Sequence, residues 1–311
     1  MGAAGTARHL EPRPGIVAGV GDAVEAEFAK DRWDATVLGI PTRRGHNIAR
    51  FAGIEQPWLR ESVKTWARFR LGAGYAFGTV DATGQNMARF SQFLTTRPDI
   101  VDATGLNREL IEAFLVWMAT RPLAASTRAS TLCFVKGFLE WGRRHHSLAG
   151  LSADAVIYEE EVTRPPDQLP KFVPEFVMAQ PEDPDNLARL RNPTVRHLVI
   201  VLMETGLRGG DASALPFNPI VADSTGWPCL RFDNSKVSIE QLIPLSAKAA
   251  ETIRVQQDHV RTNWPDGSPW LFPGILDNAD GAKAYAHGSL SQQLRDWQRN
   301  IGLHDEAGQS V

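Results

Sequence analysis

The stretch METGLRGGDASALP, Met203–Pro216, determines how the second half of the chain is interpreted. It continues the apolar segment NPTVRHLVIVL, whose composition predicts a buried helix. Gly206 stands where that helix should end, because glycine adopts the left-handed conformation of a helix C-cap without steric cost. Leu207 can make the apolar contact that accompanies such a cap. Gly206 therefore has a structural explanation, and Arg208, two residues later, does not.

Arg208 is followed by two glycines and then by Asp211. Neighbours without side chains allow a phosphate or a backbone to approach an arginine closely. If a second helix starts here, Asp211 lies at i+3 and can steady the guanidinium group. The stretch therefore predicts a helix, a glycine cap and a fixed arginine that can hold an anion.

The region upstream, residues 51–160, has the apolar spacing of an all-α bundle. Amphipathic helices are predicted in the segments QPWLRESVKTWARFRL, TVDATGQNMARFSQFLTT, NRELIEAFLVWMATR and ASTRASTLCFVKGFLEWGRRHH. Asn107 is the candidate N-cap of the third segment. Residues 1–50 are an N-terminal extension to which the sequence assigns no role.

The region downstream, residues 175–311, has a mixed pattern. Two short strands, CLRF and QLIPL, flank the turn DNSK, and the helices SAKAAETIRVQQDHVRTNW and SLSQQLRDWQRNIGL follow. The whole chain is therefore expected to be mainly α, with one small antiparallel sheet in its second domain.

The net charge of −3 conceals strong local asymmetry. Residues 42–70 carry seven cations against two carboxylates, and residues 121–146 carry five against one. Such runs are typical of surfaces that bind nucleic acid, although a solvated helix face gives the same pattern. On the last predicted helix of the bundle, the candidate DNA-binding residues are Arg128, Lys136, Arg143 and Arg144.

The opposite charge gathers between residues 153 and 185, where nine carboxylates accompany two cations. This acidic region includes YEEEVTRPPDQLPKFVPEF, whose four prolines resist regular structure. We place an acidic, proline-rich linker at residues 161–174, between the two domains.

Several classes of protein are excluded by composition. The longest aliphatic run, LVIVLM, is far shorter than the roughly 20 residues of a membrane span, and the N-terminus lacks a signal-peptide core. Cys133 and Cys229 are too few for a disulfide framework or a metal cluster. We therefore expect a cytoplasmic protein with no membrane, metal or cofactor.

The segment TGLRGGDASALP resembles the first arginine box of the tyrosine recombinases, the phage integrase family. Further resemblances follow in the family's order: LPKFVPEF to the entry into its catalytic domain, Lys236 in DNSKVSIEQLIPLS to its β-hairpin lysine, and WLFPG to its Leu-Phe-Pro element. They cover roughly residues 75–303. The helical region then resembles the family's core-binding domain, which holds DNA, and residues 175–311 resemble part of its catalytic domain.

The resemblance implies a role for each matching residue. Arg208 would clamp the scissile phosphate, Lys236 would act as the general acid for the leaving 5′ oxygen, and Asp211 would buttress Arg208. The implied partners are double-stranded DNA and further copies of the protein on that DNA. In the complete protein, cleavage would pass through a 3′-phosphotyrosyl intermediate.

The chain departs from the family at its C-terminal end. The family's His-x-x-Arg box and nucleophilic tyrosine should follow the helix that ends near Leu303, and neither is present. His304 has no arginine at the fourth place, and we expect it to be a loop residue. The tyrosines at 75, 158 and 285 all precede the position of that box, and we expect structural or surface roles for them.

Three functions remain open on this basis. The chain could be a site-specific recombinase, integrase or transposase whose C-terminal catalytic part is absent. It could also be a non-catalytic remnant that occupies recombination sites. A helical protein-interaction module without DNA binding is the third alternative.

Overall fold

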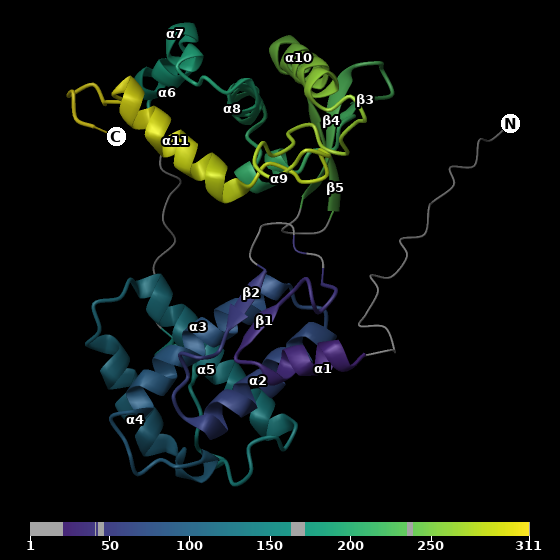
Figure 1. The fold of residues 1–311 in the computed structure, drawn as a ribbon. Helices are drawn as coiled ribbons and strands as arrows, with labels where there is room; N and C mark the ends of the chain where they lie inside the picture. The colour runs from purple at the N-terminus through teal and green to yellow at the C-terminus, as the bar shows by residue number, and fades with distance from the viewer. Residues whose placement is uncertain (1–20, 41, 43–46, 163–171, 235–238, 311) are drawn as a thin grey trace, which may run out of the picture. The chain divides into compact units, whose positions relative to one another are not determined.

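The computed structural model describes residues 21–40, 42, 47–162, 172–234 and 239–310. These residues form two compact units (Figure 1). The first unit contains the described residues up to 162, and the second contains those from 172 onward. The predicted linker, residues 161–174, falls largely outside the described part of the chain.

The first unit contains the four predicted helices of the bundle. Asn107 caps one of them as predicted, because its Oδ1 accepts a hydrogen bond of 2.9 Å from the backbone N–H of Leu110. The elements of this unit, in chain order, are α1 (Asp22–Ala29), β1 (Arg32–Asp34), β2 (Ile48–Arg50), α2 (Pro57–Gly72), α3 (Phe77–Leu94), the 3-10 turn η1 (Ala103–Gly105), α4 (Arg108–Ala119), α5 (Ala125–Arg144) and the 3-10 turn η2 (Glu159–Glu161).

The described part of the N-terminal extension packs into the core of the bundle. Strands β1 and β2 pair antiparallel, with Trp33 opposite Ala49. The Trp33 ring is buried between Phe28 and Phe51, with ring centroids 4.9 and 4.6 Å away. Phe90 of α3 belongs to the same hydrophobic cluster. The described part of the extension therefore forms one layer of the first unit.

Helix α3 lies directly against the backbone of β2 at Gly84. A Cβ atom at this position would lie 2.1 Å from the carbonyl oxygen of Arg50, which is far inside van der Waals contact. Gly78, on the same helix, has no atom within 4 Å of the equivalent position. Glycine is therefore required at 84 by close packing and is replaceable at 78.

Replacing Gly84 by alanine is expected to lower the free energy of unfolding by about 3 kcal/mol, because backbone must move to admit the methyl group. Gly78→Ala is the matched control and should raise it by about 0.5 kcal/mol, since alanine is the better helix former. Urea denaturation followed by circular dichroism measures both changes. Equal stability of the two variants would show that α3 and β2 are not in this contact.

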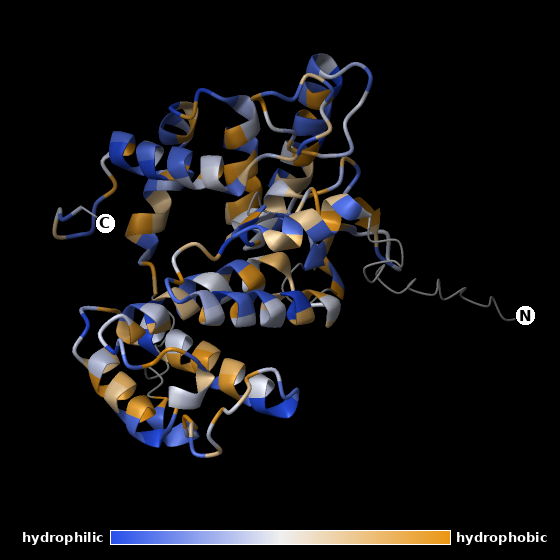
Figure 2. Ribbon diagram, turned by 60° about the horizontal axis from the view of Figure 1, so that its bottom comes forward, coloured by the Kyte–Doolittle hydropathy of each residue, from blue (hydrophilic) through white to orange (hydrophobic). Residues whose placement is uncertain are grey.

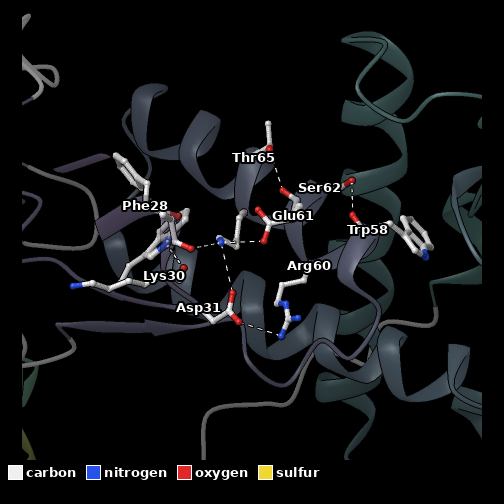
Figure 3. Close-up of polar contacts among 11 residues, drawn as sticks. Phe28, Lys30, Asp31, Trp58, Arg60, Glu61, Ser62 and Thr65 are labelled. Carbon is white, nitrogen blue, oxygen red and sulfur yellow. Dashed lines mark hydrogen bonds and ion pairs between the residues drawn. The ribbon is translucent and has the colours of Figure 1, made fainter. Parts of the chain in front are cut away.

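Three described cations of the basic run at residues 42–70 form ion pairs within the first unit, namely Arg60, Lys64 and Arg68. Asp31 accepts from the Arg60 guanidinium at 3.1 Å, as Figure 3 shows. The buried Lys64 ammonium donates to the carbonyl of Ala29 at 2.9 Å and lies 3.1 Å from a carboxylate oxygen of Glu61. These contacts join the end of α1 to α2. These three cations are therefore paired within the first unit rather than unpaired on its surface.

The second unit contains a three-stranded sheet surrounded by helices. The strands are antiparallel in the order β3-β4-β5, with Val221 opposite Cys229 and Leu230 opposite Ile243. The elements, in chain order, are α6 (Glu175–Glu182), α7 (Pro184–Ala188), α8 (Pro193–Thr205), α9 (Gly209–Ser213), β3 (Ile220–Ala222), β4 (Pro228–Asn234), β5 (Ile239–Pro244), α10 (Ala247–Asn263) and α11 (His287–Ile301).

A buried glutamine joins three segments of this unit. The side-chain oxygen Oε1 of Gln256 on α10 accepts a hydrogen bond of 2.8 Å from Nδ1 of His197 on α8, because an amide oxygen can only accept. Its amide N–H also donates to the carbonyl of Leu271 at 3.0 Å. Burial lowers the pKa of His197, which favours the neutral ring in this contact. Gln256 thus positions the Leu-Phe-Pro segment against α8 and α10.

The predicted fold class is confirmed: the protein is mainly helical, with two small antiparallel sheets. Hydrophobic and hydrophilic residues alternate around the helices of both units, as expected for amphipathic helices (Figure 2). Within the described ranges, no helix is both long enough and apolar enough to cross a membrane.

Candidate functional site

Arg208 is positioned by the turn that ends α8. Gly206 has φ +65°, and its backbone N–H donates to the carbonyl of Leu202 at 2.9 Å, as in a left-handed helix cap. The Thr205 hydroxyl donates to the Val201 carbonyl at 2.6 Å. Arg208 is then the N-cap residue of α9. The glycine cap predicted from the sequence is therefore present, and it places Arg208 between two helices.

The Arg208 guanidinium is held at one of its nitrogens. Its Nη1 donates to Oδ1 of Asn234 at 3.1 Å and lies 3.6 Å from Oδ2 of Asp211. The Arg208 side chain is 53% exposed, whereas that of Asp211 is only 2% exposed. Both contacts use Nη1, so they orient the guanidinium group through one of its three nitrogens. The predicted pairing of Asp211 with Arg208 is thus found in the structure.

Asn234 was not predicted as a site residue, although it contacts Arg208 directly. It ends β4 and pairs with Ile239 of β5, and its amide N–H donates to Oε1 of Gln241 at 3.0 Å. The first arginine box and the end of the β4–β5 pair therefore meet. Lys236, the predicted general acid, lies outside the described residues.

Gly209 is explained by helix packing. A Cβ atom here would lie 3.1 Å from the imidazole of His287, the first residue of α11, and 3.6 Å from Leu290. From the sequence, we expected Gly209 to leave space for a phosphate to approach Arg208. The space beside it is filled by α11, which places the exposed His287 next to the Arg208 turn.

The Leu-Phe-Pro element is buried and is hydrogen-bonded to the segment that follows α9. The backbone N–H of Leu271 donates to the Leu215 carbonyl at 2.9 Å, and that of Tyr285 donates to the Phe272 carbonyl at 2.7 Å. Leu271 and Phe272 are fully buried. This segment anchors the chain just after α9 and so supports the position of Arg208.

The three tyrosines have structural surroundings. Tyr285 is only 4% exposed, and its hydroxyl oxygen accepts a hydrogen bond of 2.5 Å from the amide of Gln293. Burial raises the pKa of Tyr285, which disfavours the phenolate. Tyr75 and Tyr158 belong to the first unit, where each ring stacks under a guanidinium group, Arg70 at 4.6 Å and Arg108 at 4.9 Å.

His304 follows α11 in an extended segment. Its ring packs edge-on against Phe176, with centroids 5.6 Å apart, and its Nδ1 lies 2.9 Å from the carbonyl of Gly302. Among the described residues, no group of three or more His, Cys, Asp or Glu side chains is placed to hold a metal ion.

The predicted DNA-binding residues of α5 differ in their surroundings. Arg128 donates to the Leu123 carbonyl, and Arg143 donates to the carbonyls of Ser152 and Ala155 at 3.3 and 3.0 Å. These two arginines thus tie loops to α5, and their assignment as DNA contacts remains a prediction.

The other two residues of this set are Lys136 and Arg144. Lys136 donates to Glu159 of η2 at 2.9 Å, and this bond raises the pKa of the lysine. The acidic segment after α5 therefore folds back onto the basic helix. Arg144, at the end of α5, is exposed.

No family model matches the chain. It is 26% identical over 260 residues to transposase B from transposon Tn554 of Staphylococcus aureus, covering 79% of this chain and 39% of that protein. Transposase B from transposon PsiTn554 of the same species gives the same values. The chain thus spans about two fifths of the length of these relatives.

Two groups of solved structures share the fold. The XerH site-specific recombinase bound to its difH substrate superposes with a TM-score of 0.55 at 13% identity, over 79% of this chain and 68% of that one. Lambda integrase residues 75–356 bound to DNA gives 0.55 at 14% identity, over 80% of each chain. The chain therefore has the fold of the tyrosine recombinases, and the resemblance predicted from its motifs is confirmed.

Proposed function

We propose that this chain is the DNA-binding and phosphate-holding part of a site-specific recombinase or transposase of the tyrosine type. The observation that carries the proposal is the Arg208 guanidinium, which is exposed yet fixed by Asn234 and the buried Asp211. The similarity to transposase B and the recombinase fold support the same activity. The whole protein would cleave and rejoin DNA strands through a phosphotyrosyl intermediate.

Arg208 suits this chemistry because of its geometry. In-line attack on a phosphodiester builds negative charge on the non-bridging oxygens, and a planar guanidinium can donate two parallel hydrogen bonds to them. A donor that is already oriented needs little reorganisation when that charge develops. We assign Arg208 as the phosphate clamp, Asp211 as its buttress and Lys236 as the general acid.

The partner in this proposal is double-stranded DNA. Lambda integrase has been solved as a dimer on a core site and as a tetramer on a Holliday junction, which supports self-association of this chain on DNA. Acting on DNA would place the protein in the cytoplasm. We assign the first unit to holding the duplex, with Lys136 and Arg144 of α5 as its phosphate contacts.

Binding to DNA is expected to weaken steeply with salt, since each contacted phosphate contributes about −0.9 to the slope of log affinity against log salt. Fluorescence anisotropy with a labelled duplex measures that slope for the 311-residue chain. Lys136→Gln combined with Arg144→Gln should make it about 1.8 less steep if each residue contacts one phosphate.

The matched control is Arg97→Gln, which removes a cation paired with Asp99 on the same unit. It should leave the slope unchanged. A chain that does not bind the duplex at any salt concentration would contradict the proposed function and favour the protein-interaction alternative. An equal effect of Arg97→Gln would show that only overall charge matters, and the assignment of α5 would fail.

A further inference from the structure

A cavity of about 380 Å³ opens on the first unit where the ends of α3 and α4 meet the start of α5. Arg89, Gln92 and Thr95 line it from α3 and the turn after it, and Trp117 and Arg121 line it from α4 and the turn that follows. Two described lining residues carry a positive charge, and none carries a negative charge. None of these residues belongs to the basic helix face assigned above.

Arg121 is held in place by an aromatic ring. Its guanidinium carbon lies 4.1 Å from the centroid of Trp117, a separation at which a cation is attracted to the ring face. Trp117 in turn contacts Phe93 and Phe114, with centroids 5.8 and 6.3 Å away. The arginine is therefore positioned by the core of the unit without a carboxylate partner in the described part of the chain.

Arg89 is held by the interface between α3 and α5. Its Nη1 donates to Oδ1 of Asn86 at 3.1 Å, and that same oxygen accepts from the Thr131 hydroxyl at 2.9 Å. A weaker contact of 3.4 Å joins Nη1 to the carbonyl of Gln85. Because these contacts all use Nη1, the other donors of Arg89 remain available to a ligand.

The threonine hydroxyls of the pocket are already committed. Thr95 donates to the carbonyl of Gln92 at 2.7 Å, and Thr96 donates to that of Phe93 at 2.7 Å. The donors left for a ligand are therefore the two guanidinium groups and the side-chain amide of Gln92. Such a donor set fits an anion with several acceptor oxygens, as a phosphate group has.

Three other cations of the first unit form ion pairs with carboxylates. Arg68, Arg108 and Lys136 pair with Glu25, Glu161 and Glu159. A second cavity, of about 350 Å³, is lined by three carboxylates and two cations and does not select for an anion. The pocket at α3, α4 and α5 differs from these sites because its charge is uncompensated among the described residues that line it.

We propose that this pocket holds one backbone phosphate of duplex DNA, as a contact separate from those of Lys136 and Arg144. The inference rests on the proposed function and adds a second site at which the first unit contacts a phosphate of the duplex. The pocket is open and has no free hydroxyl donors, so it offers few contacts to an isolated phosphate ion. A duplex binds more tightly than inorganic phosphate, because its other contacts with the protein and the release of counterions add to the binding free energy.

The test compares Arg89→Gln and Arg121→Gln with the control Arg97→Gln in salt titrations of binding to a labelled duplex. Each pocket variant should weaken binding and make the salt slope about 0.9 less steep, and the control should do neither. Thermal melts of each variant establish that it is folded. If one pocket variant does not fold, the other still decides the result.

Three outcomes would overturn the inference, and they are distinguishable from one another. If the unsubstituted chain binds DNA but both pocket variants have its salt slope, only the pocket assignment fails. If the unsubstituted chain does not bind DNA, the proposed function fails together with the pocket. If inorganic phosphate raises the melting temperature, Arg121→Gln abolishes that rise, and neither pocket variant changes DNA affinity or its salt slope, the pocket is a site for free phosphate and not for DNA.

Discussion

Replacing Arg208 by lysine is expected to slow DNA strand cleavage by about two orders of magnitude or more while leaving DNA affinity nearly unchanged. Lysine keeps the charge but loses the planar fork, one arm of which is fixed by Asn234. The test requires a protein that joins this chain to a His-x-x-Arg box and a nucleophilic tyrosine. The rate of covalent adduct formation on a nicked suicide duplex, measured under single-turnover conditions, gives the comparison.

The matched control for Arg208→Lys is Arg254→Lys on α10. Arg254 is an exposed arginine of the same unit that also pairs with a carboxylate at i−3, Glu251. Its replacement should leave the cleavage rate unchanged. Near-normal cleavage by the Arg208 variant would instead show that this arginine only occupies the N-cap position of α9.

The 311-residue chain alone is expected to form no covalent adduct with DNA. Covalent catalysis requires an oxygen nucleophile aligned with the phosphate, and groups that act as a unit lose most of their activity when one is missing. Tyr285 is buried, and burial raises the pKa of its hydroxyl group, so the nucleophilic phenolate form is disfavoured. The adduct is assayed on a denaturing gel with the same suicide duplex.

Tyr285→Phe in the cleavage-competent protein provides the complementary measurement. This variant loses the hydrogen bond from Gln293 but should retain cleavage, since the nucleophile lies elsewhere. An adduct of the 311-residue chain that maps to Tyr75, Tyr158 or Tyr285 would contradict both the assignment of the tyrosines and the placement of the site at Arg208.

Local sequence patterns were sufficient to predict most helices and the glycine-capped turn that precedes Arg208. Glycine at 206 and the apolar run before it specify a left-handed helix cap, and the observed φ of +65° agrees. Asn107 similarly marks the start of α4. Such features depend on residues within one turn, so that a single sequence contains the information needed to predict them.

Contacts between distant segments were not predictable in the same way. Asn234 meets Arg208 only because β4 ends beside α9, and His287 fills the space at Gly209 only because α11 packs there. Neither residue carries a local signal of this role. The charge runs were also ambiguous, since the pairing of Lys136 with Glu159 depends on how the segment after α5 folds back.

The central claim, that Arg208 holds a DNA phosphate, is tested most directly by a structure of this chain bound to a duplex selected for tight binding. We expect an Arg208 guanidinium nitrogen to lie about 2.7–3.2 Å from a non-bridging oxygen of a backbone phosphate, with Asp211 and Asn234 still beside it. A bound duplex whose phosphates are contacted by other residues of the second unit, with Arg208 directed into solvent, would contradict it.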